Sequence, residues 1–216
     1  MPDLTFSIES AEPILYSASP QLGVKVRVHS DDPNALIHNV ILHSQIQIEP
    51  TRRHYVLEEQ EQLRDLFGEP ARWGQTLKPM LWTNTSTVVA SFQGETVAEV
   101  PIPCTFDFNV AATKYFHGLS DGDLPLNFLF SGTVFYQDAH GSLQVAPISW
   151  EREARFRLPV KTWQRLMESY YPNSAWLSLR KDVFELLYHY KTRLGIPTWE
   201  QTVERLLADV EETAQS

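Results

Sequence analysis

The sequence contains a single cysteine and only nine glycines. One cysteine cannot form an intramolecular disulfide, so the chain is not a secreted disulfide scaffold. Glycine is too scarce for a phosphate-binding loop, and neither GxGxxG nor the P-loop pattern occurs. The serine-hydrolase pattern GxSxG and the metal-site patterns HExxH, HxH and CxxC are missing as well. We therefore expect no cofactor and no bound metal.

Long apolar runs and an excess of positive charge are also missing. No apolar run approaches the roughly 20 residues that a membrane helix needs, and the first residues do not form a signal peptide. The net charge is −9, from 18 Lys and Arg against 27 Asp and Glu. A nucleic-acid binder needs a basic surface, and an anionic membrane repels an acidic one. We expect a cytoplasmic protein that binds neither nucleic acid nor membrane.

The spacing of apolar residues changes near Pro159. Before it, apolar and polar residues alternate, as in Val24–Val28, which is typical of half-buried strands. After it, apolar residues recur every three or four positions, as in Trp176, Leu179, Val183, Leu186 and Tyr190, which indicates amphipathic helices. The predicted strands are Leu4–Glu9, Gly23–His29, Asn39–Ile48, Leu81–Phe92, Thr96–Pro101, Thr105–Ala111, Leu124–Tyr136, Leu143–Ile148 and Ala154–Leu158.

The predicted fold is mainly β with C-terminal α. Residues 1–158 are expected to form an antiparallel β-sandwich, because Phe92–Thr96 and Gln137–Ser142 have the composition of hairpin turns. A three-helix segment at residues 159–216 is expected to pack on it. The first helix is predicted to start at Pro159 and the second to run from about Ala175 to Leu194. The third is predicted to open with a capping box at Thr198–Gln201.

One connection, at about residues 49–79, is long enough to be an insert in the β domain. It is predicted to hold one short helix, from about Leu57 to Phe67. The acidic residues of this helix are expected to form a solvated face; they are Glu58, Glu59, Glu61 and Asp65.

The insert also gathers arginines beside an indole, which is unusual in an acidic chain. Arg and Trp are enriched at interface hot spots, so the candidate binding residues are Arg52, Arg53, Arg72 and Trp73. The alternative is structural. Each arginine would then pair with a carboxylate such as Glu58, Asp65 or Glu69, and Trp73 would fill an end of the sandwich.

Other residues suggest chemistry less directly. Cys104 has apolar or strand-forming neighbours and is expected to be buried. Gly132 lies inside a strand pattern, where it marks a bulge or a close approach of backbones. An enzyme of unrecognised type would have His117, Asp121 and Asp123, or Cys104, at its centre. The tail aromatics are expected to dock the helices on the β domain; any that stay exposed would mark a partner site.

Several strings of the sequence resemble one uncharacterised bacterial family, a domain of unknown function, over almost the whole chain. They are Leu66–Gly74, Leu81–Thr83, Pro103–Asp107, Lys114–His117 and Leu129–Phe135. Members of that family are encoded near nickel–iron hydrogenase genes in actinobacteria and related soil bacteria. The resemblance implies an accessory or assembly role. It assigns no catalytic residue.

The leading hypothesis is a non-catalytic accessory protein that binds another protein, through the insert or through a face of the tail. One alternative is a small-molecule or lipid-binding β-sandwich, in which the many aromatic residues would line a cavity. The other is an enzyme of unrecognised type. The sequence leaves the oligomeric state open.

Overall fold

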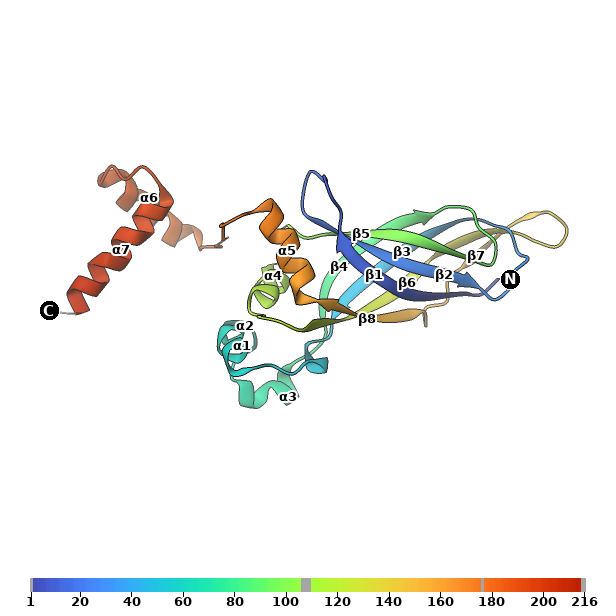
Figure 1. The fold of residues 1–216 in the computed structure, drawn as a ribbon, viewed down its shortest axis with the longest axis horizontal. Coiled ribbons are helices and arrows are strands. Elements are labelled where there is room, and N and C mark those ends of the chain that lie inside the picture. Colours follow the sequence, from blue (N-terminus) through green and yellow to red (C-terminus); the bar gives the residue numbers. More distant parts are fainter. Residues whose placement is uncertain (1, 106–109, 176, 215–216) are drawn as a thin grey trace. The chain divides into compact units, whose positions relative to one another are not determined.

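The computed structural model describes residues 2–105, 110–175 and 177–214 (Figure 1). In these residues the chain is mainly antiparallel β, with eight strands in two sheets. The three-stranded sheet has the order β1 (Leu4–Pro13), β2 (Gln21–Ser30), β5 (Glu95–Pro103). The five-stranded sheet consists of β4 (Met80–Val89), β3 (Ile37–Ile48) and β6 (Asp123–Gln137), with β7 (Leu143–Pro147) and β8 (Glu153–Pro159) both paired to β6.

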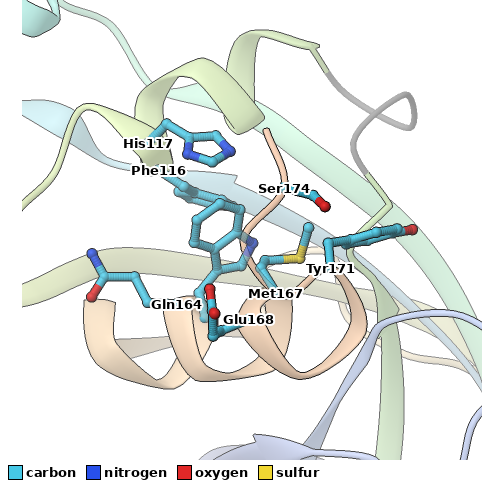
Figure 2. A pocket seen from close by; sticks show the side chains of 8 residues that line it. Phe116, His117, Gln164, Met167, Glu168, Tyr171 and Ser174 are labelled. Atoms are coloured by element: carbon cyan, nitrogen blue, oxygen red, sulfur yellow. The ribbon is translucent and has the colours of Figure 1, made fainter. Parts of the chain in front are cut away.

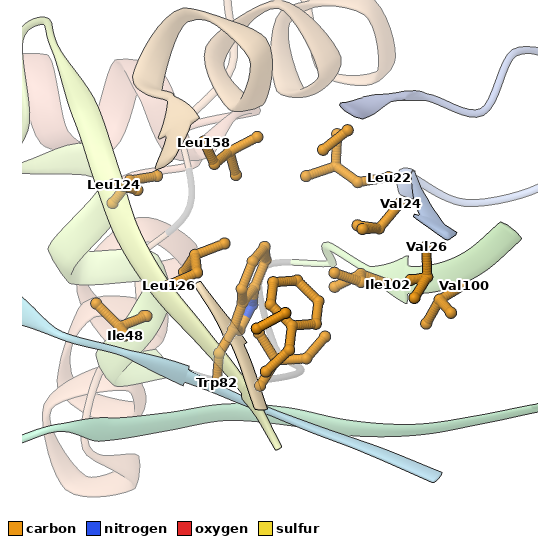
Figure 3. Packing of buried hydrophobic residues seen from close by; sticks show 14 of the residues in the cluster. Leu22, Val24, Val26, Ile48, Trp82, Val100, Ile102, Leu124, Leu126 and Leu158 are labelled. Carbon is orange, nitrogen blue, oxygen red and sulfur yellow. The ribbon is translucent and has the colours of Figure 1, made fainter. Parts of the chain in front are cut away.

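The inner faces of the two sheets meet in one hydrophobic core. Figure 3 shows Val24 and Ile102 of the three-stranded sheet facing Trp82 and Leu126 of the five-stranded sheet. The predicted alternation produces this core: Val40, Leu42, Ser44, Ile46 and Ile48 of β3 are all buried. Aromatic rings fill the space between the sheets, because Phe6 stacks on Phe130 with ring centroids 4.5 Å apart.

The predicted hairpin at Phe92–Thr96 is wrong. β4 pairs with β3 and β5 pairs with β2, so the chain crosses from one sheet to the other at Gln93–Gly94. Side-chain hydroxyls join the two strands instead of a backbone ladder. Thr85 Oγ1 donates to the carbonyl of Pro101 at 3.0 Å, and Thr87 Oγ1 to that of Glu99 at 3.3 Å.

The predicted strand Thr105–Ala111 is also corrected. Thr105 lies outside any strand, and Val110 begins the helix α4 (Val110–His117); residues 106–109 lie outside the described residues. α4 buries Ala112, Tyr115 and Phe116. The helix has only eight residues, too few for its apolar period to be read clearly from the sequence.

The insert between β3 and β4 is more broken than predicted. It contains two 3-10 turns, η1 (Pro50–Arg52) and η2 (Pro70–Arg72), and three short helices, α1 (Leu57–Gln62), α2 (Arg64–Phe67) and α3 (Trp73–Thr76). The single predicted helix is divided at Leu63, which is buried in the main core.

Contacts divide the chain into two units, residues 1–174 and 175–216. The first tail helix, α5 (Val160–Tyr170), belongs to the first unit and buries Val160, Trp163, Leu166 and Met167. α6 (Lys181–Arg193) and α7 (Trp199–Ala214) make up the second unit. α6 starts later than the predicted Ala175, and Trp176 lies outside the described residues. No helix among the described residues is long and apolar enough to cross a bilayer.

Candidate functional site

Arg53 and Glu59 form an ion pair inside the insert. Arg53 Nη2 lies 2.5 Å from Glu59 Oε1, and the two side chains are 8% and 3% exposed. The prediction that Glu59 belongs to a solvated acidic face is therefore wrong for this residue. A buried carboxylate must have its oxygens satisfied. Glu59 accepts further hydrogen bonds from the amide and hydroxyl of Ser120 and from the amide of Val56.

The same arginine holds the loop that precedes β6. Its guanidinium donates to the carbonyl oxygens of Asp121 and Asp123, at 2.6 and 2.9 Å. Gly122, between these two residues, lies against the Arg53 guanidinium and has φ +80°, a backbone conformation that favours glycine. Arg53 therefore joins the insert to the β6 loop through both Nη atoms, while its buried Nε has no hydrogen-bond partner among the described residues.

Trp73 is buried as well, with 6% of its surface exposed. Its indole nitrogen donates to the Gly68 carbonyl at 3.0 Å. Its ring packs edge-on against Tyr55 and Phe67, with centroids 5.2 and 5.6 Å away. Tyr55 continues the cluster through a 2.8 Å hydrogen bond to the hydroxyl of Tyr115. Trp73 thus fills space, as the structural alternative for this residue supposed.

The structure does not place the four candidate binding residues on one surface. Arg52 is exposed and pairs with Glu49 at 2.9 Å, and Arg72 is exposed on η2. Arg53 and Trp73 lie inside. The burial of the Arg53–Glu59 ion pair could not be predicted from the sequence, because Ser120, which donates to Glu59, is far from both residues along the chain. One local signal was available. Glu59 follows Val56 by three positions, the spacing at which a glutamate accepts from the amide that precedes a helix.

Two shallow cavities lie beside this cluster and share Arg52 and Arg157 in their walls. The larger, about 420 Å³, is also lined by Asp121 and Asp123. Its wall contains both carboxylates and guanidiniums, and Lys161 pairs with Asp121 at 3.2 Å. Neither sign of charge dominates, so the cavity favours neither an anion nor a cation.

His117 lies in a different cavity, of about 200 Å³, between α4 and α5 (Figure 2). It packs edge-on against Trp163, with ring centroids 5.1 Å apart. Burial lowers the pKa of His117 below its usual 6.5, which favours the neutral imidazole. Asp121 and Asp123 line the other cavity, so the structure does not bring this predicted set of residues together.

Cys104 is buried, as predicted. Its thiol donates to the Ile102 carbonyl at 3.5 Å, and burial raises its pKa to about 12. A nucleophilic cysteine needs a lowered pKa, because the thiolate is the reactive form. The buried environment of Cys104 raises its pKa instead and disfavours the thiolate.

Cys104 is therefore expected to resist a thiol reagent while the protein is folded. At pH 8 its thiol is protonated and covered, so Ellman's reagent should react only as fast as the chain opens. After unfolding in guanidinium, one thiol per chain should react at once. The absorbance of the released thionitrobenzoate measures both. Rapid reaction of the folded protein would contradict the burial described here.

The second unit exposes a large apolar surface. Six residues of α6 and α7 form what we call the apolar face: Phe184, Tyr188, Trp199, Val203, Leu207 and Val210, all exposed. The rings of Phe184 and Tyr188 lie 5.3 and 6.3 Å from that of Trp199. The last four follow one side of α7, at the spacing of a helical stripe. From the sequence, the tail aromatics were expected to dock the helices on the β domain, and any that stayed exposed were expected to mark a partner site.

The two helices contact each other over a smaller set of side chains. Thr202 is fully buried and its hydroxyl donates to the Thr198 carbonyl. Tyr190 donates to Asp209 at 3.3 Å. Lys191 lies over the ring of Trp199 and donates to the carbonyls of Ile196 and Pro197. These contacts hold α6 against α7 and leave the apolar face toward solvent.

Comparison with known proteins identifies a family but no activity. The model of a family of unknown function (DUF6084) matches residues 1–215, so the chain belongs to that family. No curated protein and no solved structure matches it. The expected membership of a domain-of-unknown-function family is confirmed.

Proposed function

We propose that this member of a family of unknown function is a non-catalytic accessory protein of the bacterial cytoplasm, which binds another protein through the apolar face of α6 and α7. In this proposal the two sheets form a β-sandwich that carries the binding helices. The observation that supports it is the exposure of the face, where Leu207 and Val210 are 61% and 66% exposed.

Exposed apolar patches of this kind are typical of interaction sites. Burying a side chain such as Leu or Val fully contributes roughly 1.5–3 kcal/mol. Four such positions on α7 form a continuous stripe, and the aromatic residues of α6 widen it. A partner helix that covers the stripe would gain enough to bind, as in helix-in-groove recognition.

The partner in this proposal is a protein of nickel–iron hydrogenase assembly. This choice of partner follows from the family resemblance alone, which implies genes close to those of that enzyme. The exposed Arg52 and Arg72 of the insert offer a second place for contact.

The two alternative functions find less support. A small-molecule or lipid carrier would need aromatic residues around an open space, whereas Phe6, Phe128 and Phe130 pack against one another. The enzyme predicted from the sequence would bring His117 together with Asp121 and Asp123, whereas these two carboxylates line another cavity and the carboxylate in the His117 cavity is Glu168.

Affinity purification of the full chain from its native host tests the proposed function. The Leu207→Gln variant is expected to recover at least about tenfold less partner than the unaltered protein, because a polar amide replaces a central apolar contact. Leu186→Gln is the matched control. Leu186 is 71% exposed on α6, about half a turn around the helix from Phe184 and Tyr188. Equal recovery with both variants would refute the proposed surface.

A further inference from the structure

A row of carboxylates borders the apolar face along α7. Glu200, Glu204 and Glu211 are spaced by four and seven positions, so they lie on one side of the helix. Leu207 lies three positions after Glu204 and four before Glu211, and is therefore their neighbour on the helix surface. All three glutamates are exposed, and none forms an ion pair within the described residues.

The stability of α7 alone does not account for this row. Glu200 is in the first turn, where the helix dipole favours a negative charge. Glu204 follows at the i,i+4 distance, where two like charges repel. Glu211 lies near the C-terminal end, where the dipole disfavours a carboxylate. A cation from outside the chain would relieve both costs.

Three of the five basic residues of the second unit have partners in it; of the other two, Arg193 ends α6 and Arg205 lies about 100° around α7 from Glu204, away from the row of glutamates. Arg180 pairs with Asp182 at 3.0 Å, and Lys181 with Glu185 at 3.7 Å. Lys191 lies over Trp199 and binds two carbonyl oxygens. Lys191 therefore lies at the Trp199 end of the apolar face, whereas Glu204 and Glu211 border its Leu207 part and form no ion pair within the described residues.

We infer that the partner presents an amphipathic helix whose apolar stripe is bordered by lysine or arginine. This inference rests on the proposed function. The apolar stripe of the partner covers Val203, Leu207 and Val210, and its cations meet the three glutamates. From Trp199 to Val210 the stripe extends for roughly 16 Å, which matches about three turns of a partner helix.

Charge distinguishes this partner from two other occupants of the face. A second copy of the chain would bring the same three glutamates, and two acidic borders would then lie around one apolar seam. An anionic membrane attracts amphipathic helices whose polar side carries lysine and arginine. The border of α7 has the opposite sign. A basic amphipathic helix is complementary in both apolar surface and charge.

Two synthetic peptides of about 18 residues test the inference against the full chain. Both carry the same leucine stripe on an alanine-rich helix; one has lysines along its border and the other has glutamines. Fluorescence anisotropy measures their dissociation constants. The lysine peptide is expected to bind at least about tenfold more tightly, and this advantage should fall as salt rises from about 0.05 to about 0.5 M.

Variants of the protein show whether the lysine peptide is attracted by the three glutamates of α7 or by the net negative charge of the whole chain. The triple variant Glu200→Gln, Glu204→Gln, Glu211→Gln should remove the advantage of the lysine peptide. A triple variant with the same net charge, Glu12→Gln, Glu61→Gln, Glu151→Gln, should keep it, because these exposed glutamates lie in the first unit. If both triple variants lose it equally, general attraction explains the binding and the inference is overturned.

The Leu207→Gln variant distinguishes a failure of this inference from a failure of the proposed function. It should weaken both peptides about tenfold. If it does so while the peptides bind equally well, the acidic border has no role: the inference fails and the proposed function survives. If neither peptide responds to Leu207→Gln, both fail.

Two further measurements test the other occupants. A concentration-dependent dimer in sedimentation that Leu207→Gln abolishes would overturn the inference in favour of a second copy. Cosedimentation with phosphatidylcholine–phosphatidylglycerol vesicles that the same variant abolishes would overturn it in favour of lipid. A monomer that does not cosediment agrees with the inference.

Discussion

Gly132→Ala is expected to destabilise the protein by about 3–5 kcal/mol, a large part of the stability of an ordinary domain. Gly132 lies in β6 opposite Leu42 of β3, with φ +139°. A Cβ at this position would lie 1.9 Å from the carbonyl oxygen of Ile41. That oxygen is backbone in the neighbouring strand and cannot move without separating β3 from β6. Unfolding in guanidinium, followed by far-ultraviolet circular dichroism, measures the loss.

Gly74→Ala is the matched control. Gly74 lies in α3, and a Cβ there meets no atom within 4 Å. Its replacement is expected to leave the stability unchanged or to raise it by up to about 1 kcal/mol, because alanine is the better helix former. If the Gly132 and Gly74 variants unfold at the same denaturant concentration, the close approach of β3 and β6 is wrong.

Arg53→Met is expected to cost about 3–5 kcal/mol, because it leaves the buried Glu59 carboxylate without its cation. It also removes the donors to the Asp121 and Asp123 carbonyls, so the loop before β6 should loosen. Denaturant unfolding reports the first effect, and faster amide exchange at Ser120 reports the second.

Two comparisons establish that burial causes this cost. Arg64→Met breaks an ion pair with Glu69 in which both side chains are 60% exposed, and is expected to cost no more than about 1 kcal/mol. Adding Glu59→Gln to Arg53→Met should recover much of the loss, because the amide oxygen can still accept from Ser120 without a buried charge. If the double variant is no more stable than Arg53→Met, the unpaired charge of Glu59 does not cause the loss of stability.

Most strands could be predicted because each buries one face. In β3 the alternation from Val40 to Ile48 gives the inner side chains directly. Pairing could not be predicted in the same way. Gln93–Gly94 would suit a hairpin as well as a crossing between sheets, and only the distant strands β2 and β3 decide between them. Gly132 was recognised as a bulge or a close approach; regular pairing with Leu42 shows the close approach.

The candidate site was only partly predictable, for a related reason. The sequence shows that Arg52, Arg53 and Arg72 are charged, but burial depends on segments far along the chain. Arg53 is internal because the loop at Asp121–Asp123 folds over it. The stripe of α7 was visible in the sequence, since helical period is local. Whether it was covered or exposed was not visible, since that depends on tertiary contacts.

The division after residue 174 has a consequence for how this family can diversify. The residues of the apolar face belong to a unit with its own internal contacts, whereas the hydrophobic cluster of the sheets extends only to Tyr171. Selection for a foldable β core and selection for a particular partner therefore act on different stretches of the gene. Under the proposed function, substitutions in residues 175–216 would change the binding preference and leave the hydrophobic core of the first unit intact.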